Sequence, residues 1–294
     1  MRSVGRLAGA GLLSLGYLLC LMPAASGARA LPEDLLNFPI QILIDEQIKG
    51  SGFYLVTSSA LYLVSTKHLI YDKVSGRRNG KVATLLSYTG GPKAESRNIL
   101  KVNLETLETA GEITKHEKQD VLVIRLGTVK SDTGNVNVTF LDQVKAMELV
   151  LPGLVHVSPK RTGGLDRVLV GNEVFIFGYP ASLGLRAAPQ IEESRPLLRK
   201  GIVAGINHKT GTVILDCPVY RGNSGGPVVQ VEEIAPGRRE YLIIGLVSEW
   251  VPFAEEWLNT TQGYSNLNLS NSGYSVAVPM DAIYELLGRT KEER

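Results

Sequence analysis

One serine of this chain stands in a glycine-rich segment, residues 221–227, which read RGNSGGP. Glycines beside Ser224 allow the backbone to turn so that its N–H groups face an oxygen that gains negative charge when the hydroxyl attacks a carbonyl carbon. A nucleophilic serine also needs a base, normally histidine, and a carboxylate that orients the histidine. The segment therefore predicts acyl-transfer chemistry at Ser224, and an inert glycine-rich β-turn is the alternative.

The order of the candidate groups along the chain distinguishes the types of serine hydrolase. Gly222-x-Ser224-x-Gly226 matches the nucleophile elbow of α/β-hydrolases, but that fold places its histidine after the serine. All four histidines precede the serine: His68, His116, His156 and His208. The subtilisin order needs an earlier aspartate, available at Asp34 or Asp45, but also a βα pattern that the chain lacks. The order His, Asp, Ser remains.

Five segments resemble the trypsin-like (chymotrypsin-fold) serine proteases, in particular the bacterial, disulfide-poor type. LVSTKH, ending at His68, is similar to the segment that carries the catalytic histidine, and DVLVI, starting at Asp120, to the aspartate that leads into an apolar strand. GSGF at 50–53, GNSGGP at 222–227 and GLVS at 245–248 resemble the strand entry, the serine signature and the strand behind the specificity pocket. The similarity runs from about residue 45 to the last predicted helix.

This resemblance implies a role for each matching residue. Ser224 would be the nucleophile, His68 the general base and acid, and Asp120 the orienting carboxylate. The backbone N–H groups of Gly222 and Ser224 would form the oxyanion hole, which lowers the barrier by a few kcal/mol. A structural loop or core histidine is the alternative for His68, and the nearby Asp132 and Asp142 are alternatives to Asp120.

The resemblance also places a specificity pocket. Pro218 stands six residues before the serine, where a negative charge would select basic substrates. With Val219, Tyr220, Ser248 and Trp250 as its neighbours, we expect a preference for small or medium apolar side chains. Digestive relatives carry an aspartate just before the serine that pairs with a newly cut N-terminus. The neutral Asn223 stands there, so we expect no activation of that kind.

No metal or other cofactor is expected. Residues 116–120, HEKQD, look superficially like a zinc-binding helix, but Asp120 replaces the second histidine and no other ligand lies nearby. Cys217 has no neighbouring histidine, so we expect a buried small residue and not a nucleophile.

The first 30 residues have the pattern of a secretory signal peptide. Arg2 and Arg6 precede an uncharged stretch over 7–28, and residues 28–30, ARA, provide small residues around a cleavage point. An uncleaved membrane anchor and a lipid-modified Cys20 are the alternatives, although glycines and Pro23 interrupt the apolar run. Since one cysteine then remains, no internal disulfide can form, which favours a bacterial protein that is secreted or periplasmic.

Composition restricts the partners. The 294 residues are 44% apolar and 20% charged, with a formal net charge of +2. These values exclude a disordered chain, a collagen-like repeat and a disulfide-stapled miniprotein. Without a basic excess, nucleic acid is not an expected partner. The expected partner is a polypeptide substrate, with no stable membrane insertion once the leader is removed.

The elements that must position these groups are mostly strands. Runs such as 52–57, 61–65, 120–124, 173–177 and 241–247 are rich in β-branched, aromatic and apolar residues and are bounded by turn residues. We predict an all-β fold, and the resemblance implies two antiparallel six-stranded β-barrels within a peptidase domain over 31–294. The barrels would cover about 31–155 and 165–278, followed by a helix over about 281–290 that Asp281 caps. We expect no appended PDZ domain.

The predicted function is an exported serine endopeptidase. A catalytically silent binding protein and an esterase on the same fold are the alternatives.

Overall fold

The computed structural model describes residues 31–88, 97–132, 135–145, 147–150, 153–181, 188–192 and 194–288. By its internal contacts the chain divides into two units, Met1–Pro32 and Glu33–Arg294, and the elements described below belong to the second. The predicted signal peptide, residues 1–30, lies outside the described residues. Within them, no helix has the length and apolar character needed to cross a membrane.

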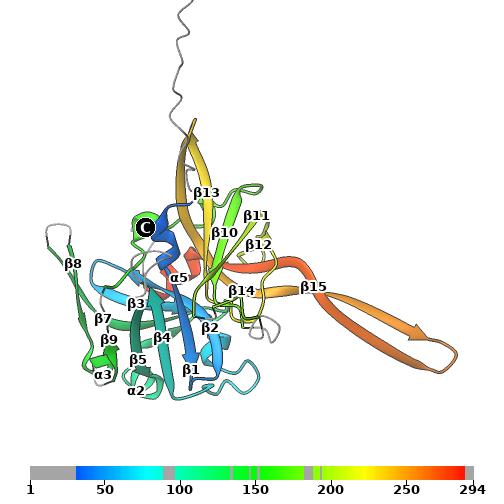
Figure 1. The fold of residues 1–294 in the computed structure, drawn as a ribbon, viewed down its shortest axis with the longest axis horizontal. Coiled ribbons are helices and arrows are strands. Elements are labelled where there is room, and N and C mark those ends of the chain that lie inside the picture. The colour runs from blue at the N-terminus through cyan, green and yellow to red at the C-terminus, as the bar shows by residue number, and fades with distance from the viewer. Residues whose placement is uncertain are drawn as a thin grey trace, which may run out of the picture. The chain divides into compact units, whose positions relative to one another are not determined.

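The first half of this unit is one antiparallel sheet, here called the N-terminal sheet (Figure 1). Its strand order is β6-β7-β3-β2-β1-β4-β5-β9, and β8 pairs with β7. The strands are β1 (Pro39–Ile44), β2 (Ile48–Val56), β3 (Ala60–Ser65), β4 (Val82–Tyr88), β5 (Arg97–Asn103), β6 (Ile113–Lys115), β7 (Leu122–Asp132), β8 (Asn135–Phe140) and β9 (Leu149–Val150). Short helices lie between them: α1 (Lys67–Ile70), α2 (Leu104–Thr109) and α3 (Asp142–Lys145).

The second half is a closed antiparallel barrel of six strands in the order β10-β11-β12-β15-β14-β13, here called the C-terminal barrel. Its strands are β10 (Glu173–Gly178), β11 (Leu197–Asn207), β12 (Thr212–Asp216), β13 (Pro227–Ala235), β14 (Arg238–Asn259) and β15 (Tyr264–Pro279). Helix α5 (Met280–Leu286) follows the last strand. Three short 3-10 turns complete the described elements: η1 (Glu33–Asn37), η2 (Pro159–Arg161) and η3 (Leu165–Arg167).

Each half buries its own apolar core. Side chains two residues apart on a strand share a face, and Ile40, Ile42 and Ile44 of β1 are fully buried in the N-terminal sheet. Val174 and Ile176 of β10 do the same in the C-terminal barrel. Full burial of such a side chain stabilises the fold by roughly 1.5–3 kcal/mol. The two cores therefore hold the strands in place, and the ends of these strands carry the polar groups of the site.

The predicted all-β class with a C-terminal helix is confirmed, and the C-terminal barrel has the predicted six strands. The N-terminal sheet has nine strands where six were expected, because the short β6 pairs with β7, β7 runs on into a hairpin with β8, and the chain returns to add β9 beside β5. The predicted domain boundaries stay a prediction.

The predicted cap of the last helix was wrong. Helix α5 begins at Met280 with Pro279 as its N-cap. The carboxylate of Asp281 instead accepts a hydrogen bond from the backbone N–H of Leu165 at 2.6 Å.

Strands β14 and β15 continue beyond the barrel as a two-stranded hairpin, which Figure 1 shows in orange, away from the other strands. Pairing over Pro252–Asn259 and Tyr264–Asn271 forms this hairpin, here called the arm. No strand was predicted from the sequence in this region.

Candidate active site

His68 and Asp120 form a close pair at the edge of the N-terminal sheet. The distance from His68 Nδ1 to Asp120 Oδ2 is 2.6 Å, and the backbone N–H of His68 donates to Asp120 Oδ1 at 3.0 Å. Strands β3 and β7 bring them together, because β3 ends just before α1, which carries His68, and β7 begins just after Asp120. Both carboxylate oxygens therefore hold the same residue, which orients the imidazole ring.

Ser248 supplies a further hydrogen bond to this carboxylate. Its hydroxyl donates to Asp120 Oδ2 at 2.9 Å. Burial acts to raise the pKa of Asp120, but the His68 ring, the His68 backbone N–H and the Ser248 hydroxyl outweigh it, so the pKa lies below its ordinary value. Asp120 is therefore a carboxylate at neutral pH, ready to stabilise a protonated His68.

The turn that carries Ser224 requires its glycines. Gly222 and Gly225 have φ values of +93° and +87°, which favour glycine. A Cβ atom on Gly222 would lie 2.1 Å from the carbonyl oxygen of Tyr179, and one on Gly225 would lie 1.9 Å from that of Ser51. The close approach of neighbouring backbone explains why this serine stands among glycines.

Ser224 shares a cavity of about 410 Å³ with His68 and Gly222. Its hydroxyl donates to the carbonyl oxygen of Ser248 at 3.0 Å. Among the described residues, no hydrogen bond joins Ser224 to His68. The hydroxyl must leave the Ser248 carbonyl before it can donate to the imidazole.

Two backbone N–H groups beside the serine are available for an incoming oxygen. The carbonyl of Arg221 accepts from the N–H of Ala181 at 2.7 Å, and the planar peptide bond directs the N–H of Gly222 to the opposite side. No acceptor within the described part of the chain pairs with the N–H of Gly222 or of Ser224. The arrangement can stabilise an oxyanion.

Ser51 connects the N-terminal sheet to this turn, and the sequence analysis missed its role. Its hydroxyl donates to the carbonyl oxygen of Gly222 at 2.6 Å and accepts from the N–H of Tyr179 at 3.1 Å. Its backbone N–H donates to the carbonyl oxygen of Ser224 at 2.8 Å. The signal was present in Gly50-Ser51-Gly52, a serine between glycines, but only the strand entry was inferred from it.

The predicted pocket residues separate into three places. Val219, Tyr220 and Trp250 line a cavity of about 260 Å³, together with Arg221 and Asn271. Pro218 is half-buried beside this group and does not line the cavity. Ser248 lies at the Asp120 carboxylate.

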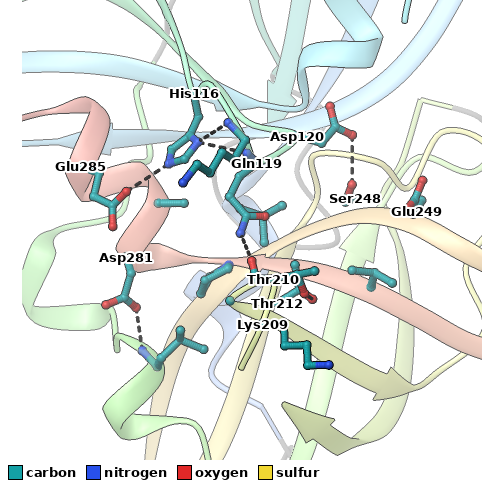
Figure 2. Close-up of a pocket in the computed structure, with 17 residues that line it drawn as sticks. His116, Gln119, Asp120, Lys209, Thr210, Thr212, Ser248, Glu249, Asp281 and Glu285 are labelled. Carbon is teal, nitrogen blue, oxygen red and sulfur yellow. Dashed lines mark hydrogen bonds and ion pairs between the residues drawn. The ribbon is translucent and has the colours of Figure 1, made fainter. Parts of the chain in front are cut away.

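A third cavity, of about 590 Å³, is lined in part by Asp120 and Ser248 (Figure 2). There His116 points from the Asp120 segment toward Glu285 of α5, with 3.0 Å between Nε2 and Oε2. The side-chain amide of Gln119 donates to the carbonyl oxygen of Thr210 on the C-terminal barrel. These two contacts attach the segment that carries Asp120 to the second half.

The alternatives to Asp120, and the residues that were not assigned a catalytic role, lie outside the cluster of His68, Asp120 and Ser224. Asp142 is exposed on α3 and pairs with Lys145 at 3.1 Å, and of Asp132 only the backbone is described. Cys217 is buried, and burial raises the pKa of its thiol to about 11, so the thiol stays protonated at neutral pH. Burial lowers the pKa of His156, and His208 is exposed.

Comparisons with known proteins give a likeness in fold only. No family model and no curated protein matches the chain. The solved structures that resemble it include serine proteases. The HtrA-type protease AlgW with a tripeptide is 14% identical, covering 86% of this chain and 60% of its own, with a TM-score of 0.45. A thermostable serine protease, AL20, from an extremophilic microorganism is 12% identical, covering 87% of this chain and 96% of its own, with a TM-score of 0.48.

The chain thus spans about 60% of the length of AlgW. At these identities and TM-scores the likeness says nothing of activity. The strand order, the closed six-stranded barrel and the C-terminal helix of this chain themselves give its fold class, which is all-β and of the chymotrypsin-like type.

Proposed function

We propose that this protein is a serine endopeptidase that hydrolyses peptide bonds through His68, Asp120 and Ser224. One observation carries the proposal: the 2.6 Å contact between His68 Nδ1 and Asp120 Oδ2, beside a cavity that His68 shares with Ser224. A serine nucleophile needs such a constellation, in which a carboxylate, here the half-buried Asp120, holds the base in one tautomer.

The reaction begins when a bound peptide draws the Ser224 hydroxyl away from the Ser248 carbonyl. His68 Nε2 accepts the hydroxyl proton while Oγ attacks the scissile carbonyl carbon. The N–H groups of Gly222 and Ser224 donate to the resulting oxyanion. Asp120 remains ionised and stabilises the protonated imidazole.

His68 then gives its proton to the leaving amine, and the C–N bond breaks. This leaves an ester between Ser224 and the acyl part of the substrate. A water molecule, deprotonated by His68, attacks this ester, and the proton returns to Ser224 Oγ as the acid product leaves. Each step uses side chains and backbone N–H groups of this chain together with water.

A protein-cleavage assay tests this function. Incubation with an unfolded protein substrate should give new peptide N-termini, and Ser224→Ala or His68→Ala should abolish them. The pair Ser224→Ala and Ser75→Ala makes a matched comparison, since Ser75 lies on an exposed loop. Cleavage of activated esters without cleavage of peptides would assign an esterase instead.

A catalytically silent binding protein is the second candidate. The hydrogen bond from Ser224 to the Ser248 carbonyl favours it, because the hydroxyl is directed away from the base. Hydrogen bonds of catalytic groups are often long or misaligned without substrate, so this geometry is also compatible with an enzyme. Binding of a peptide that is never cleaved would favour the silent protein.

We also propose that the protein is exported, secreted or periplasmic. The support is the basic, apolar and small-residue pattern of residues 1–30. Mass spectrometry of the protein recovered outside the cytoplasm should show an N-terminus at Leu31, and an N-terminus at Met1 would contradict cleavage.

A further inference from the structure

The arm exposes large apolar side chains. More than half of the surface of each is exposed: Phe253, Trp257, Leu258, Tyr264, Leu267 and Leu269. The strand register places Leu258, Leu267 and Leu269 on one face, since Glu256 pairs with Leu267 and Ala254 with Leu269. An isolated two-stranded hairpin is at best marginally stable in water, and monomers rarely expose such a patch. The arm therefore needs a partner.

The two edges of the arm differ in what protects them. The β14 edge carries Pro252, Glu255 and Glu256, the kinds of residue that prevent a further strand from adding. The β15 edge over Tyr264–Asn271 reads YSNLNLSN and has neither charge nor proline. Strand β12 pairs with β15 only from Tyr274 to Ala277, so no described strand covers the β15 edge of the arm. An added strand is expected there.

The β15 edge is complementary to itself. In antiparallel pairing, directly opposed residues point to the same face of the sheet. When a two-fold axis relates the two strands, one residue must therefore lie opposite its own copy, and the axis passes midway between these two copies. An axis at Asn268, in the middle of the uncovered edge, sets Leu267 of one copy opposite Leu269 of the other. Asn268 then lies opposite its own copy, and no two charges meet. Cross-strand apolar pairs of this kind stabilise a sheet.

We propose that the arm is a self-association element, in which a second copy of the chain adds its β15 edge to this one. The two arms would form one antiparallel sheet of four strands, with the backbone hydrogen bonds of strand addition. The face of each arm that carries Leu258, Leu267 and Leu269 would become continuous with the same face of the other copy.

Sedimentation velocity of the folded protein, over a range of concentrations, tests the proposal. The wild type should sediment as a dimer. Asn266→Lys with Asn268→Lys sets like charges across the axis, and the dimer should weaken roughly tenfold or more. The matched control, Thr260→Lys with Gln262→Lys, adds the same charge at the turn of the same arm and should leave the dimer intact.

A charge-swap experiment separates lost pairing from lost folding. Asn266→Glu with Asn268→Glu should also be monomeric, and an equimolar mixture of the Lys and Glu variants should restore a dimer. A monomeric wild type at every concentration, or a dimer that both charge variants retain, would overturn the proposal. One further result would also overturn the proposal: the wild type is monomeric, and the Lys variant loses only the cleavage of long apolar polypeptides. The arm would then bind substrate and not a second copy. Sedimentation does not depend on the proposed protease activity.

Discussion

The hydroxyl of Ser51, on the N-terminal sheet, donates to the carbonyl oxygen of Gly222, on the C-terminal barrel, at 2.6 Å. The same hydroxyl accepts from the N–H of Tyr179 at 3.1 Å. Because the N–H of the same residue, Gly222, belongs to the proposed oxyanion hole, one buried serine holds this turn in place across the two halves of the fold.

Removal of that hydroxyl tests the effect on catalysis. Ser51→Ala should lower kcat by roughly tenfold to a hundredfold with little change in KM, because the oxyanion donors act in the transition state. Steady-state kinetics on a peptide substrate give both constants. Ser87→Ala is the control, since this buried serine accepts from Asn98 Nδ2, at 3.1 Å, within the N-terminal sheet. Equal losses in the two variants would contradict a positioning role for Ser51.

The contact between Ser248 and Asp120 allows two roles of Ser248 to be distinguished: orientation of the Asp120 carboxylate and selection of the substrate side chain. Its hydroxyl donates to Asp120 at 2.9 Å, so Ser248→Ala should lower kcat several-fold and leave the cleavage preference unchanged. Peptide-library profiling of both proteins checks this. Ser275→Ala is a matched change in the same barrel, where the hydroxyl donates to the Cys217 carbonyl at 2.9 Å. An altered cleavage preference in Ser248→Ala would indicate that Ser248 lines the specificity pocket, as predicted from the sequence.

Asn223 should not tolerate a charge. It is buried, its Oδ1 accepts from the N–H of Tyr220 at 3.1 Å, and its Nδ2 has no acceptor among the described residues. Asn223→Asp should lower the free energy of unfolding by about 1–3 kcal/mol at neutral pH, and less in acid, where the buried group becomes neutral. Urea unfolding measures this.

Asn207→Asp is the control for that substitution. Its Oδ1 accepts from the N–H groups of Lys209 and Thr210 in an exposed turn, and a carboxylate can accept both bonds. An Asn223→Asp protein as stable as wild type would contradict the statement that this position does not tolerate a buried charge. Activation by pairing of an aspartate at this position with a newly cut N-terminus would then be a possible mechanism for this fold.

Asp120 makes stability depend on pH in a defined direction. Its pKa lies below the ordinary 3.8, so the stabilisation from its carboxylate is complete above 3.8 and is lost as the pH falls through the lower folded value. The free-energy difference between wild type and Asp120→Asn should be constant near neutral pH and shrink only in strong acid. Asp142→Asn, at an exposed ion pair, should show almost no difference at any pH. A difference that disappears near pH 6 would contradict the lowered pKa.

We expect the cavity lined by Val219, Tyr220 and Trp250 to determine the substrate preference. Val219, Tyr220 and Trp250 line about 260 Å³, a space that suits small or medium apolar side chains. A peptide library should show this preference before the scissile bond, and Trp250→Ala should extend it to larger apolar residues. A profile dominated by arginine or lysine would contradict it.

Residue type and chain order were sufficient to propose His68, Asp120 and Ser224, because glycine spacing and strand ends are local features. The role of Ser51 was missed since it depends on a contact between the two halves of the fold. Ser248 was assigned to the pocket because its chain position, without the direction of its side chain, does not reveal the contact with Asp120. The arm was missed for another reason: its strands have no buried face, and the alternation of Leu with Asn and Ser was not recognised as a strand.

Covalent labelling of Ser224 tests the central claim most directly. A fluorophosphonate reacts only with a serine activated by its base, so the folded wild type should gain one adduct, located on Ser224 by peptide mass spectrometry. Ser224→Ala should gain none, and Asp120→Asn should react far more slowly. No labelling of the folded wild type, or an adduct on another serine, would contradict the proposed catalytic site.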